Sequence, residues 1–555
     1  MPPALTEAAE PQLRRLAAEL LVVRASGHLA DHQRRYPQWE VPNAELQELL
    51  EGGVGGVILL GGGAAEVALR CRQLRHWADQ PLLLCADVEE GVGQRFEGAS
   101  WLVPPLGLGR LHGRDPTRAS ALAERYGACT GRDARRLGLN WVLAPVCDVN
   151  NNAANPVINV RAWGEDPATV AALTTAFCRG LDSAGVLGCA KHFPGHGDTS
   201  SDSHLELPVL PHSRERLEAI ELPPFQAVIA AGVAAVMTAH LLLPALDPGR
   251  PATLSAAVLT GLLRRDLGFD GLVVTDALVM EAISRHHGPG EAAVLALEAG
   301  ADLVLMPADA RQAIAAIVAA VEEGRLRQEQ LEASARRRRL ALERVADAPP
   351  DPMAAPVVDD ALAQELVEAT METVHGGSAL SATTRPAAET PTWPASGGVN
   401  LLRLDSCLQA PFLGPTAPAL AFPGAAGLTP CLLDGLGPRL WRSDPDAPLI
   451  LESLPPGPVL LQLFVRGNPF RGSAAAGEDW PAAIGQLLRA GRLAGLAVYG
   501  SPYLWEQLRP LLPDGMPAAY SPGQMGRAQG AVLAALGLGQ GREVGHTGGR
   551  QGFTD

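Results

Sequence analysis

The part of the chain richest in side chains that can do chemistry runs from Lys191 to His204. It contains three histidines, two aspartates and one lysine, together with two glycines and a proline. It follows the short apolar run Val186–Ala190, which predicts a buried strand. A strand that opens into a glycine- and proline-rich loop with ionisable groups is a usual place for chemistry in α/β proteins. Two uses fit this loop, namely metal binding, or substrate binding combined with proton transfer.

Metal binding is the first use to consider. The side chains that could supply ligands are His192, His196, Asp198, Asp202 and His204. The segment does not have the His-Glu-x-x-His pattern of a helical metal site, and Pro194, Gly195 and Gly197 disfavour a regular helix here. A short loop can still wrap a metal ion, so a metal-dependent hydrolase stays open as an alternative.

Proton transfer is the second use, and it centres on Asp202 and His204. In an extended or turn conformation, a carboxylate two residues before an imidazole can accept its hydrogen bond. Such a bond orients the ring and raises the pKa of the imidazole, which can then act as an acid and afterwards as a base near neutral pH. The Asp-x-His spacing alone is also common among solvated loop residues.

A further carboxylate, Asp276, ends the apolar run Gly271–Thr275 and precedes an apolar segment. As a structural residue it would cap the N-terminus of a helix. As a functional residue it would be a nucleophile or a base at the end of a strand. The bare motif supports both roles.

The surrounding sequence predicts the elements that must position these groups. Apolar runs alternate with longer helical patterns, such as Asp115–Leu137 and Pro167–Ala184. Eight runs are candidate strands: Leu20–Arg24, Gly56–Leu60, Leu82–Ala86, Trp141–Val146, Leu187–Ala190, Ala234–Ala239, Leu272–Thr275 and Leu303–Met306. Eight parallel strands with crossover helices predict a (β/α)8 barrel, and a doubly wound open sheet is the alternative.

The ends of these runs favour the barrel. Their carboxyl ends carry Asp87, Asp148, Lys191 with His192, His240, and Asp276. In a barrel, all of these ends face one mouth, where the active site is built.

The rest of the chain predicts a second domain. We expect the barrel to occupy residues 1–345, followed by a Pro-, Ala-, Thr- and Ser-rich linker at 346–398 with one helix at 359–373. A smaller three-layer α/β domain is expected at 399–540, and a disordered tail at 541–555. The strands expected in this domain are Val399–Leu404, Ala419–Phe422, Val459–Phe464 and Gly495–Tyr499.

Composition narrows the classes of partner and compartment. The chain has 555 residues with 45 basic and 60 acidic side chains, a net charge of −15, which disfavours nucleic acid or an anionic membrane as partner. We interpret the basic run Arg336–Arg339 as a solvated helix face. The 8 cysteines form no Cys-x-x-Cys pair and suggest buried free thiols of a reducing compartment. With no visible secretory signal and no long apolar run, a cytoplasmic protein is expected; its oligomeric state cannot be inferred.

Taken with its neighbours, the loop resembles glycoside hydrolase family 3, in its β-N-acetylglucosaminidase branch. The match is to Lys-His-Phe-Pro-Gly-His-Gly-Asp-Thr-x-x-Asp-Ser-His-x-x-Leu-Pro, which runs without a break from Lys191 to Pro208. Further motifs follow the order of the family over residues 20–310. They are Ala144–Val149, Asn155–Ile158 through Arg161, Gly164–Pro167, Val236–His240, Pro251–Ser255, and Leu267–Gly271 leading to Thr275–Leu278.

The resemblance implies a barrel with a second α/β domain, and it implies roles for individual residues. Asp276 matches the nucleophile that forms a covalent glycosyl-enzyme, and Asp202 with His204 matches a dyad in which His204 is the acid/base. The residues that match sugar-binding positions are Asp87, Arg95, Arg161, Lys191 and His192. The implied reaction is retaining hydrolysis of terminal β-linked N-acetylglucosamine, on peptidoglycan-derived fragments, without a metal or cofactor.

Other functions stay open beside this one. A histidine acid departs from the usual pair of carboxyl groups. Being neutral, it would admit an anionic acceptor, so a phosphorylase of the same family is an alternative. A β-glucosidase or β-xylosidase, with an acid from residues 399–540, is another. A sugar-binding protein without activity would have no need of Asp276.

One segment departs from the family's pattern. After its sugar-binding aspartate the family usually shows Asp-Gln-Glu-Gly-Gly-Arg-Val-Gln-Arg, whereas this chain has Asp-Val-Glu-Glu-Gly-Val-Gly-Gln-Arg at 87–95. Glu90 and Val92 thus stand where glycine and arginine are expected. The shape of this loop and the group bound beyond the cleaved bond are left open.

Overall fold

The computed structural model describes residues 9–203, 205–345, 358–374, 393, 397–404, 410–433, 440–442, 444, 447–466 and 478–539. By their contacts, the residues form two units. One unit comprises Met1–Leu366 with Arg466–Ala476, and the other comprises Val367–Val465 with Gly477–Asp555. Within the described parts, no helix combines the length and the apolar character needed to cross a membrane.

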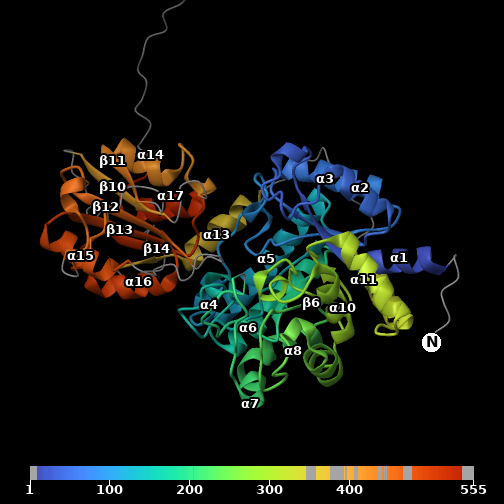
Figure 1. Ribbon diagram of the computed structural model, residues 1–555. Helices are drawn as coiled ribbons and strands as arrows, with labels where there is room; N and C mark the ends of the chain where they lie inside the picture. The colour runs from blue at the N-terminus through green and yellow to red at the C-terminus, as the bar shows by residue number, and fades with distance from the viewer. Residues whose placement is uncertain are drawn as a thin grey trace, which may run out of the picture. The chain divides into compact units, whose positions relative to one another are not determined.

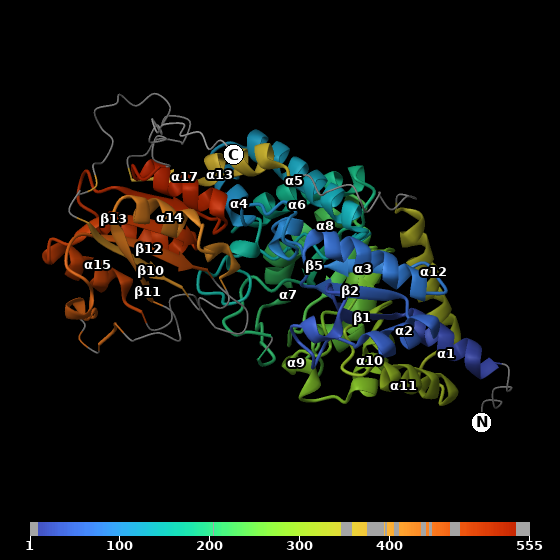
Figure 2. The same ribbon diagram turned by 90° about the horizontal axis from the view of Figure 1, so that it is seen from above.

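The first unit is a barrel of parallel strands. Its strands are β1 (Leu21–Ser26), β2 (Gly56–Leu60), β3 (Leu83–Ala86), β4 (Trp141–Val142), β5 (Cys189–Phe193), β6 (Ala235–Thr238), β7 (Leu272–Val274) and β8 (Val304–Leu305). They pair in the order β4-β3-β2-β1-β8 and β5-β6-β7. Parallel bridges from Trp141 to Leu187 and from Val274 to Leu303 join the two sets into a closed ring. The predicted (β/α)8 barrel followed by an α/β domain is therefore confirmed, and Figures 1 and 2 show the helices around the strands.

Helices separate the strands of the barrel. The α-helices are α1 (Ala9–Glu19), α2 (Asn43–Glu51), α3 (Ala64–Trp77), α4 (Leu106–His112), α5 (Pro116–Leu137), α6 (Pro167–Ser183), α7 (Arg214–Arg216), α8 (Leu222–Ala230), α9 (Glu281–Ser284), α10 (Pro289–Ala299), α11 (Ala310–Glu322) and α12 (Gln328–Glu343). A π-helix at Leu217–Glu221 precedes α8, and another at Ala257–Asp266 separates β6 from β7. The sequence specifies the starts of α5 and α6 in the same way. Asp115 and Asp166 each accept a bond from a first-turn amide, and a proline follows each of them.

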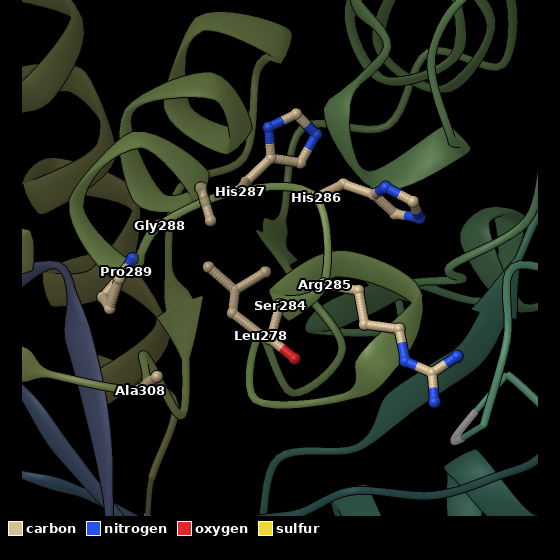
Figure 3. Close-up of a pocket in the computed structure, with 9 residues that line it drawn as sticks. Leu278, Ser284, Arg285, His286, His287, Gly288, Pro289 and Ala308 are labelled. Atoms are coloured by element: carbon tan, nitrogen blue, oxygen red, sulfur yellow. The ribbon is translucent and has the colours of Figure 1, made fainter.

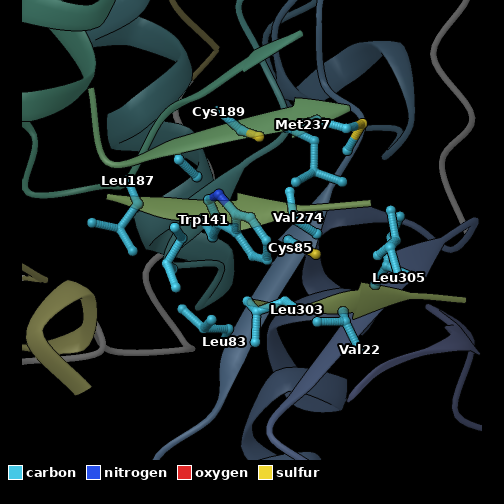
Figure 4. Close-up of a cluster of buried hydrophobic side chains, with 14 of the residues drawn as sticks. Val22, Leu83, Cys85, Trp141, Leu187, Cys189, Met237, Val274, Leu303 and Leu305 are labelled. Atoms are coloured by element: carbon cyan, nitrogen blue, oxygen red, sulfur yellow. The ribbon is translucent and has the colours of Figure 1, made fainter. Parts of the chain in front are cut away.

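The interior of the barrel is a packed hydrophobic core. Side chains from all eight strand segments meet there. Figure 4 shows many of them. Labelled members of this core are Val22, Leu83, Cys85, Trp141, Leu187, Cys189, Met237, Val274, Leu303 and Leu305. Because side chains alternate along a strand, every second residue points inward and the barrel is filled rather than hollow. Chemistry is thereby confined to the ends of the strands.

The second unit is a six-stranded sheet with helices on both faces (Figure 1). In sheet order the strands are β11 (Leu428–Leu433), β10 (Gly398–Arg403), β12 (Val459–Val465), β13 (Leu493–Gly500), β14 (Ala518–Ser521) and β9 (Glu372–Thr373). Among the described strands of this sheet, only β9 is antiparallel to its neighbour. The helices are α14 (Pro418–Ala425), α15 (Trp480–Arg489), α16 (Pro502–Leu508) and α17 (Gly526–Ala535).

One predicted element was wrong, one helix ends three residues earlier than predicted, and one strand was not predicted. The expected strand Ala419–Phe422 lies in helix α14, because a short apolar run does not distinguish a strand from a buried helix turn and Pro418 starts the helix. The expected helix 359–373 is α13 (Asp360–Thr370), and Glu372–Thr373 pairs with β14 instead. The strand β11 was not predicted, because Pro430 and its mostly exposed residues hide an edge strand. The expected tail, 541–555, lies outside the described residues.

Candidate active site

Ionisable side chains gather at the carboxyl ends of the barrel strands. Asp87 follows β3, and Lys191 and His192 lie on the last part of β5. His240 follows β6 and Asp276 follows β7. Because these ends face the same mouth of a barrel, the strands themselves bring together residues that are far apart in the sequence.

Glu89 is the centre of one cluster at this mouth. Arg161 donates to it twice, from Nε at 2.7 Å and from Nη2 at 2.9 Å. Lys191 Nζ lies 2.6 Å from Glu89 Oε1 and donates to Asp87 Oδ1 at 2.8 Å. The carboxylate of Glu89 therefore fixes two cationic side chains beside Asp87. Because the side chain of Asp87 is 37% exposed, it is the member of this cluster that solvent or a substrate can reach.

The charges of this cluster stabilise one another. Burial by itself would raise the pKa of Glu89, but Arg161 and Lys191 outweigh burial and hold that pKa well below its usual range. Burial would likewise lower the pKa of Lys191, and Asp87 and Glu89 raise it instead. Glu89, Lys191 and Arg161 are therefore charged at neutral pH. An ammonium, a guanidinium and a partly open carboxylate held rigidly in this way suit the hydroxyl groups of a sugar.

Asp148 organises a second cluster. This fully buried carboxylate accepts the backbone N–H of His192 at 3.1 Å and that of His196 at 2.7 Å. It also contacts Nδ1 of His192 at 2.7 Å. Burial opposes the ionisation of Asp148, but His192 and His196 together outweigh burial and lower its pKa. Within the described residues, Nε2 of His192 has no hydrogen-bond partner, so this ring nitrogen is left open to a ligand.

His196 braces the loop that follows. Its Nδ1 lies 2.8 Å from the Thr199 hydroxyl and its Nε2 lies 2.9 Å from the Ser203 hydroxyl. The ring is buried, and burial lowers its pKa to about 4, so it is neutral at pH 7. The two ring nitrogens of His196 therefore link it to both Thr199 and Ser203, which stabilises the conformation of the loop. Asp202, next to Ser203, is buried as well, whereas His204 lies outside the described residues.

Close backbone packing also fixes this loop. Asn155 donates from Nδ2 to the carbonyls of His196 and Gly197 at 2.9 Å each. A Cβ on Gly197 would lie 1.8 Å from the carbonyl oxygen of Val149, so only glycine fits there. The motif Asn155–Ile158 and the glycines of the loop thus support the same local structure.

Asp276 lies in a loop that other matched motifs hold in place. His240 Nε2 donates to the carbonyl of Ala277 at 3.0 Å, and its Nδ1 lies 2.8 Å from the Thr253 hydroxyl. Ala277 N–H donates to Asp276 Oδ1 at 2.7 Å. The next helix, α9, begins only at Glu281, so Asp276 does not cap a helix. The capping alternative therefore has no support. The motifs at 236–240 and 251–255 are explained instead by the contacts through which they hold the loop of Asp276 in place.

The structure brings several of the predicted site residues together. Asp87, Arg161 and Lys191 are joined through Glu89, and His192 lies next to Lys191 on β5. Arg95 is exposed and donates from Nε to the backbone oxygen of Asp87 at 3.0 Å. Sequence analysis did not assign site roles to Glu89, Asp148 and His240. The sequence did contain a signal for them, because Asp148 and His240 come just after the predicted strands Trp141–Val146 and Ala234–Ala239, and Glu89 lies two residues after Asp87.

The departure from the family pattern at Glu90 has a structural counterpart. Glu90 is buried, accepts a hydrogen bond from Trp101 Nε1 at 3.1 Å and is ion-paired with Arg466, which groups with the barrel unit. Val92, in place of the expected arginine, is fully buried. The extra carboxylate is therefore neutralised by a cation from a distant part of the sequence.

The histidines of this region have separate partners. His192 is bound to Asp148, His196 to two hydroxyls, and His212 Nε2 to Asp198 at 2.9 Å. Among the described residues, no three or more His, Cys, Asp or Glu side chains are placed to hold a metal ion together.

Family models match both units of the chain. The N-terminal domain of glycosyl hydrolase family 3 matches residues 13–340. The bacterial C-terminal domain of the same family matches residues 394–537.

Curated relatives carry consistent names. A β-hexosaminidase A of Pseudoalteromonas piscicida is 36% identical over 322 residues, which are 52% of this chain and 53% of that protein. The matched part thus spans about half the length of that relative. A β-hexosaminidase of Stenotrophomonas maltophilia is 39% identical over 271 residues, which are 48% of this chain and 80% of that protein.

Solved structures agree with these relatives. A family 3 β-N-acetylglucosaminidase from Paenibacillus has a TM-score of 0.74 at 29% identity, covering 96% of this chain and 97% of that one. NagZ from Neisseria gonorrhoeae, in complex with N-trifluoroacetyl-D-glucosamine, has a TM-score of 0.50 at 29% identity, covering 61% and 92%. Because a family model covers more than half of the residues and both domains match in order, the chain belongs to glycosyl hydrolase family 3 and is a glycoside hydrolase.

Proposed function

We propose that this enzyme is a retaining exo-acting β-N-acetylglucosaminidase that removes terminal β-linked N-acetylglucosamine from peptidoglycan-derived fragments, in the cytoplasm. The observation that carries the proposal is the arrangement at the mouth of the barrel. Asp276 follows β7 in a loop held by His240. Of the sugar-binding candidates around Glu89, Asp87 follows β3, Arg161 lies between β4 and β5, and Lys191 lies on β5. The names of the relatives, which specify hexosaminidases, support the choice of sugar.

The proposed reaction has two displacement steps. In the first, Asp276 Oδ attacks the anomeric carbon while the bond to the leaving oxygen breaks and His204 donates a proton to that oxygen. In the second, a water loses a proton to His204 and attacks the same carbon, which releases the sugar and frees Asp276. Two inversions at one carbon retain the configuration.

The remaining residues bind and orient in this proposal. Asp202 would hold the imidazole of His204 in one tautomer. Lys191, Arg161, Asp87 and the free Nε2 of His192 would bind sugar hydroxyls, and Arg95 would contact the sugar from the rim. Because Glu89 already fixes Lys191 and Arg161, little reorganisation is needed when the sugar binds.

A paired assay tests the proposal. We expect the purified protein to hydrolyse nitrophenyl β-N-acetylglucosaminide in preference to nitrophenyl β-glucoside, and Asp276→Asn to lose at least about a thousandfold in kcat. Asp79→Asn is the matched control, because Asp79 is exposed in an ion pair with Arg15 beyond the end of α3. Preference for the glucoside, or full activity of Asp276→Asn, would refute the proposal.

A further inference from the structure

The loops after β7 and β5 carry the proposed nucleophile and the proposed acid. The loop after β7 lines a pocket of about 290 Å³, shown in Figure 3, and it is fixed from outside by His240, which donates to the Ala277 carbonyl. The loop after β5 has a first part, residues 194–199, and a second part, residues 200–206, which contains His204. The contacts that fix the second part relative to the first therefore determine where the acid lies.

The first part of this loop is anchored to the barrel. The backbone N–H of His196 donates to the buried carboxylate of Asp148 at 2.7 Å, and the carbonyl of His196 accepts from Asn155 Nδ2 at 2.9 Å. On the outer side of the loop, Asp198 Oδ2 lies 2.9 Å from His212 Nε2. The backbone of His196 is therefore a fixed point relative to the strands β4 and β5.

The ring of His196 carries this anchorage into the second part of the loop. Its Nε2 lies 2.9 Å from the hydroxyl oxygen of Ser203, and both residues are buried, each 2% exposed. In the sequence, Ser203 stands between Asp202 and His204. The contact therefore fixes the backbone at the centre of the proposed acid dyad.

The direction of this hydrogen bond follows from the partners of Thr199. The imidazole of His196 is neutral at pH 7, because burial lowers its pKa to about 4, and it therefore has one N–H. The Thr199 hydroxyl donates its hydrogen to the His196 carbonyl at 3.2 Å, so its oxygen accepts from Nδ1 of the ring at 2.8 Å. Nε2 is then an acceptor, and the Ser203 hydroxyl donates to it. Loss of this hydroxyl would leave a buried acceptor without its partner.

Backbone hydrogen bonds extend the effect of Ser203 to its neighbours. The carbonyl of Asp202 accepts the N–H of Leu205 at 2.9 Å and that of Glu206 at 3.0 Å. The residues on both sides of position 204 are thus tied into one turn, and Ser203 connects this turn to the ring of His196. Since a displacement of about 1 Å can remove most of the effect of a catalytic group, this connection bears directly on the acid.

We propose that Ser203 and His196 are positioning residues for the acid, and that their hydrogen bond holds the turn at Asp202 where His204 reaches the leaving oxygen. The inference rests on the proposed function, in which His204 is the acid. Ser203 and His196 act through His204 and do not themselves touch the substrate. Because an acid matters most for a poor leaving group, the contribution of this pair should depend on the leaving group.

The first experiment compares two leaving groups. We measure kcat/KM of the wild type and of Ser203→Ala on diacetylchitobiose, whose leaving oxygen needs a proton, and on dinitrophenyl β-N-acetylglucosaminide, whose leaving group departs as an anion. We expect Ser203→Ala to lose about tenfold or more on the disaccharide and less than about twofold on the dinitrophenyl sugar. Ser200→Ala, the same substitution at an exposed position of the loop, should match the wild type on both substrates.

The second experiment observes the loop without turnover. Hydrogen exchange of backbone amides is followed by mass spectrometry in the full-length protein. The peptide that covers residues 199–207 should exchange about tenfold faster in Ser203→Ala than in the wild type, because the turn is released from His196. Peptides from α5 and α6 should be unchanged, and Ser200→Ala should exchange as the wild type does.

Three results would overturn the inference. Equal losses of Ser203→Ala on the two substrates would assign Ser203 a general structural role. An unchanged kcat/KM on the disaccharide would show that the hydrogen bond does not position the acid, and unchanged exchange of the peptide 199–207 would show that it does not hold the turn.

His204→Ala separates failure of this inference from failure of the proposed function. We expect it to show the same selective loss on the disaccharide as Ser203→Ala, but a larger one. Equal losses of His204→Ala on both substrates, or a wild type that hydrolyses neither, would refute the proposed function. The exchange experiment would still report whether Ser203 holds the turn.

Discussion

At the scale of single residues, a few buried charges determine how the site is held. Glu89 joins Arg161, Lys191 and, through Lys191, Asp87. It does not itself have to touch a substrate to matter, because it fixes the groups that would. The sequence indicated which strands carry ionisable groups, but it could not show that Glu89 rather than Asp87 is the shared partner, since pairing across strands depends on three-dimensional placement.

Removal of the charge of Glu89 should weaken both stability and sugar binding. We expect Glu89→Gln to lower the free energy of unfolding by about 3 kcal/mol, because two buried cations lose a charged partner. KM should rise more than kcat falls. Chemical denaturation and steady-state kinetics measure the two effects, and Glu165→Gln, whose half-exposed carboxylate pairs with Arg110, is the control. An unchanged unfolding midpoint for Glu89→Gln would contradict this account.

The lowered pKa of Glu89 also predicts how the free energy of unfolding depends on pH. Its pKa in the folded protein lies below the unfolded value of about 4.3. Its contribution is therefore fully present above that value and is lost as the pH falls through the folded pKa. Unfolding free energy measured from pH 5 downward should fall more steeply for the wild type than for Glu89→Gln. Parallel curves would assign the acid sensitivity to other groups.

His196 gives a second pH dependence, at higher pH. Its folded pKa of about 4 lies below the usual value for histidine, so the unfolded chain takes up a proton first. The stability it supports is complete above about pH 6.5 and is lost as the pH falls toward 4, by up to about 3 kcal/mol. Unfolding followed between pH 7 and pH 4 should be flatter in His196→Gln. An equally steep wild-type-like curve in the variant would show that His196 is not the group responsible.

At the scale of elements, the loops after β5, β6 and β7 support one another. The hydroxyl of Thr253 connects these segments. It lies 2.7 Å from the Thr238 hydroxyl and 2.8 Å from Nδ1 of His240, and it donates to the Ala239 carbonyl at 2.9 Å. His240 then holds the Ala277 carbonyl, and with it the loop of Asp276. The orientation of the proposed nucleophile is therefore set by a neighbouring strand.

A substitution at this junction should affect turnover through geometry. Thr253→Val keeps the shape of the side chain but removes the hydroxyl, so we expect kcat to fall by about tenfold or more with little change in KM. Thr260→Val is the control, because its hydroxyl donates only to Ala299, at 2.8 Å. Equal kinetics for the two variants would mean that the β6–β7 contacts do not position Asp276.

The elements also show what sequence patterns can and cannot predict. Eight parallel strands followed from apolar runs because a barrel strand is buried on both sides and has few polar residues. The secondary structure of the second unit was harder to predict. Ala419–Phe422 is as apolar as a strand but lies in α14, and β11 is an edge strand with mostly exposed residues. Exposure and edge position are set by the finished fold and leave little pattern in the residues themselves.

At the scale of the whole molecule, the account places all of the chemistry in the barrel unit. The second unit has acidic groups of its own, among them Glu478, which is ion-paired with Arg403. His204→Ala should therefore reduce kcat on an unactivated disaccharide by about a hundredfold or more, as expected for loss of a general acid. Glu478→Gln should leave turnover near that of the wild type. A large loss in Glu478→Gln at unchanged stability would move the acid to the second unit.

The central claim is that Asp276 forms the covalent glycosyl-enzyme. The most direct measurement is to trap that intermediate with a fluorinated N-acetylglucosaminyl fluoride, which slows its hydrolysis, and to locate the label by peptide mass spectrometry. The account predicts one sugar per chain, on the peptide that contains Asp276, and no label in Asp276→Asn. A label on another carboxylate, or turnover with inversion of configuration and no trapped sugar, would contradict it.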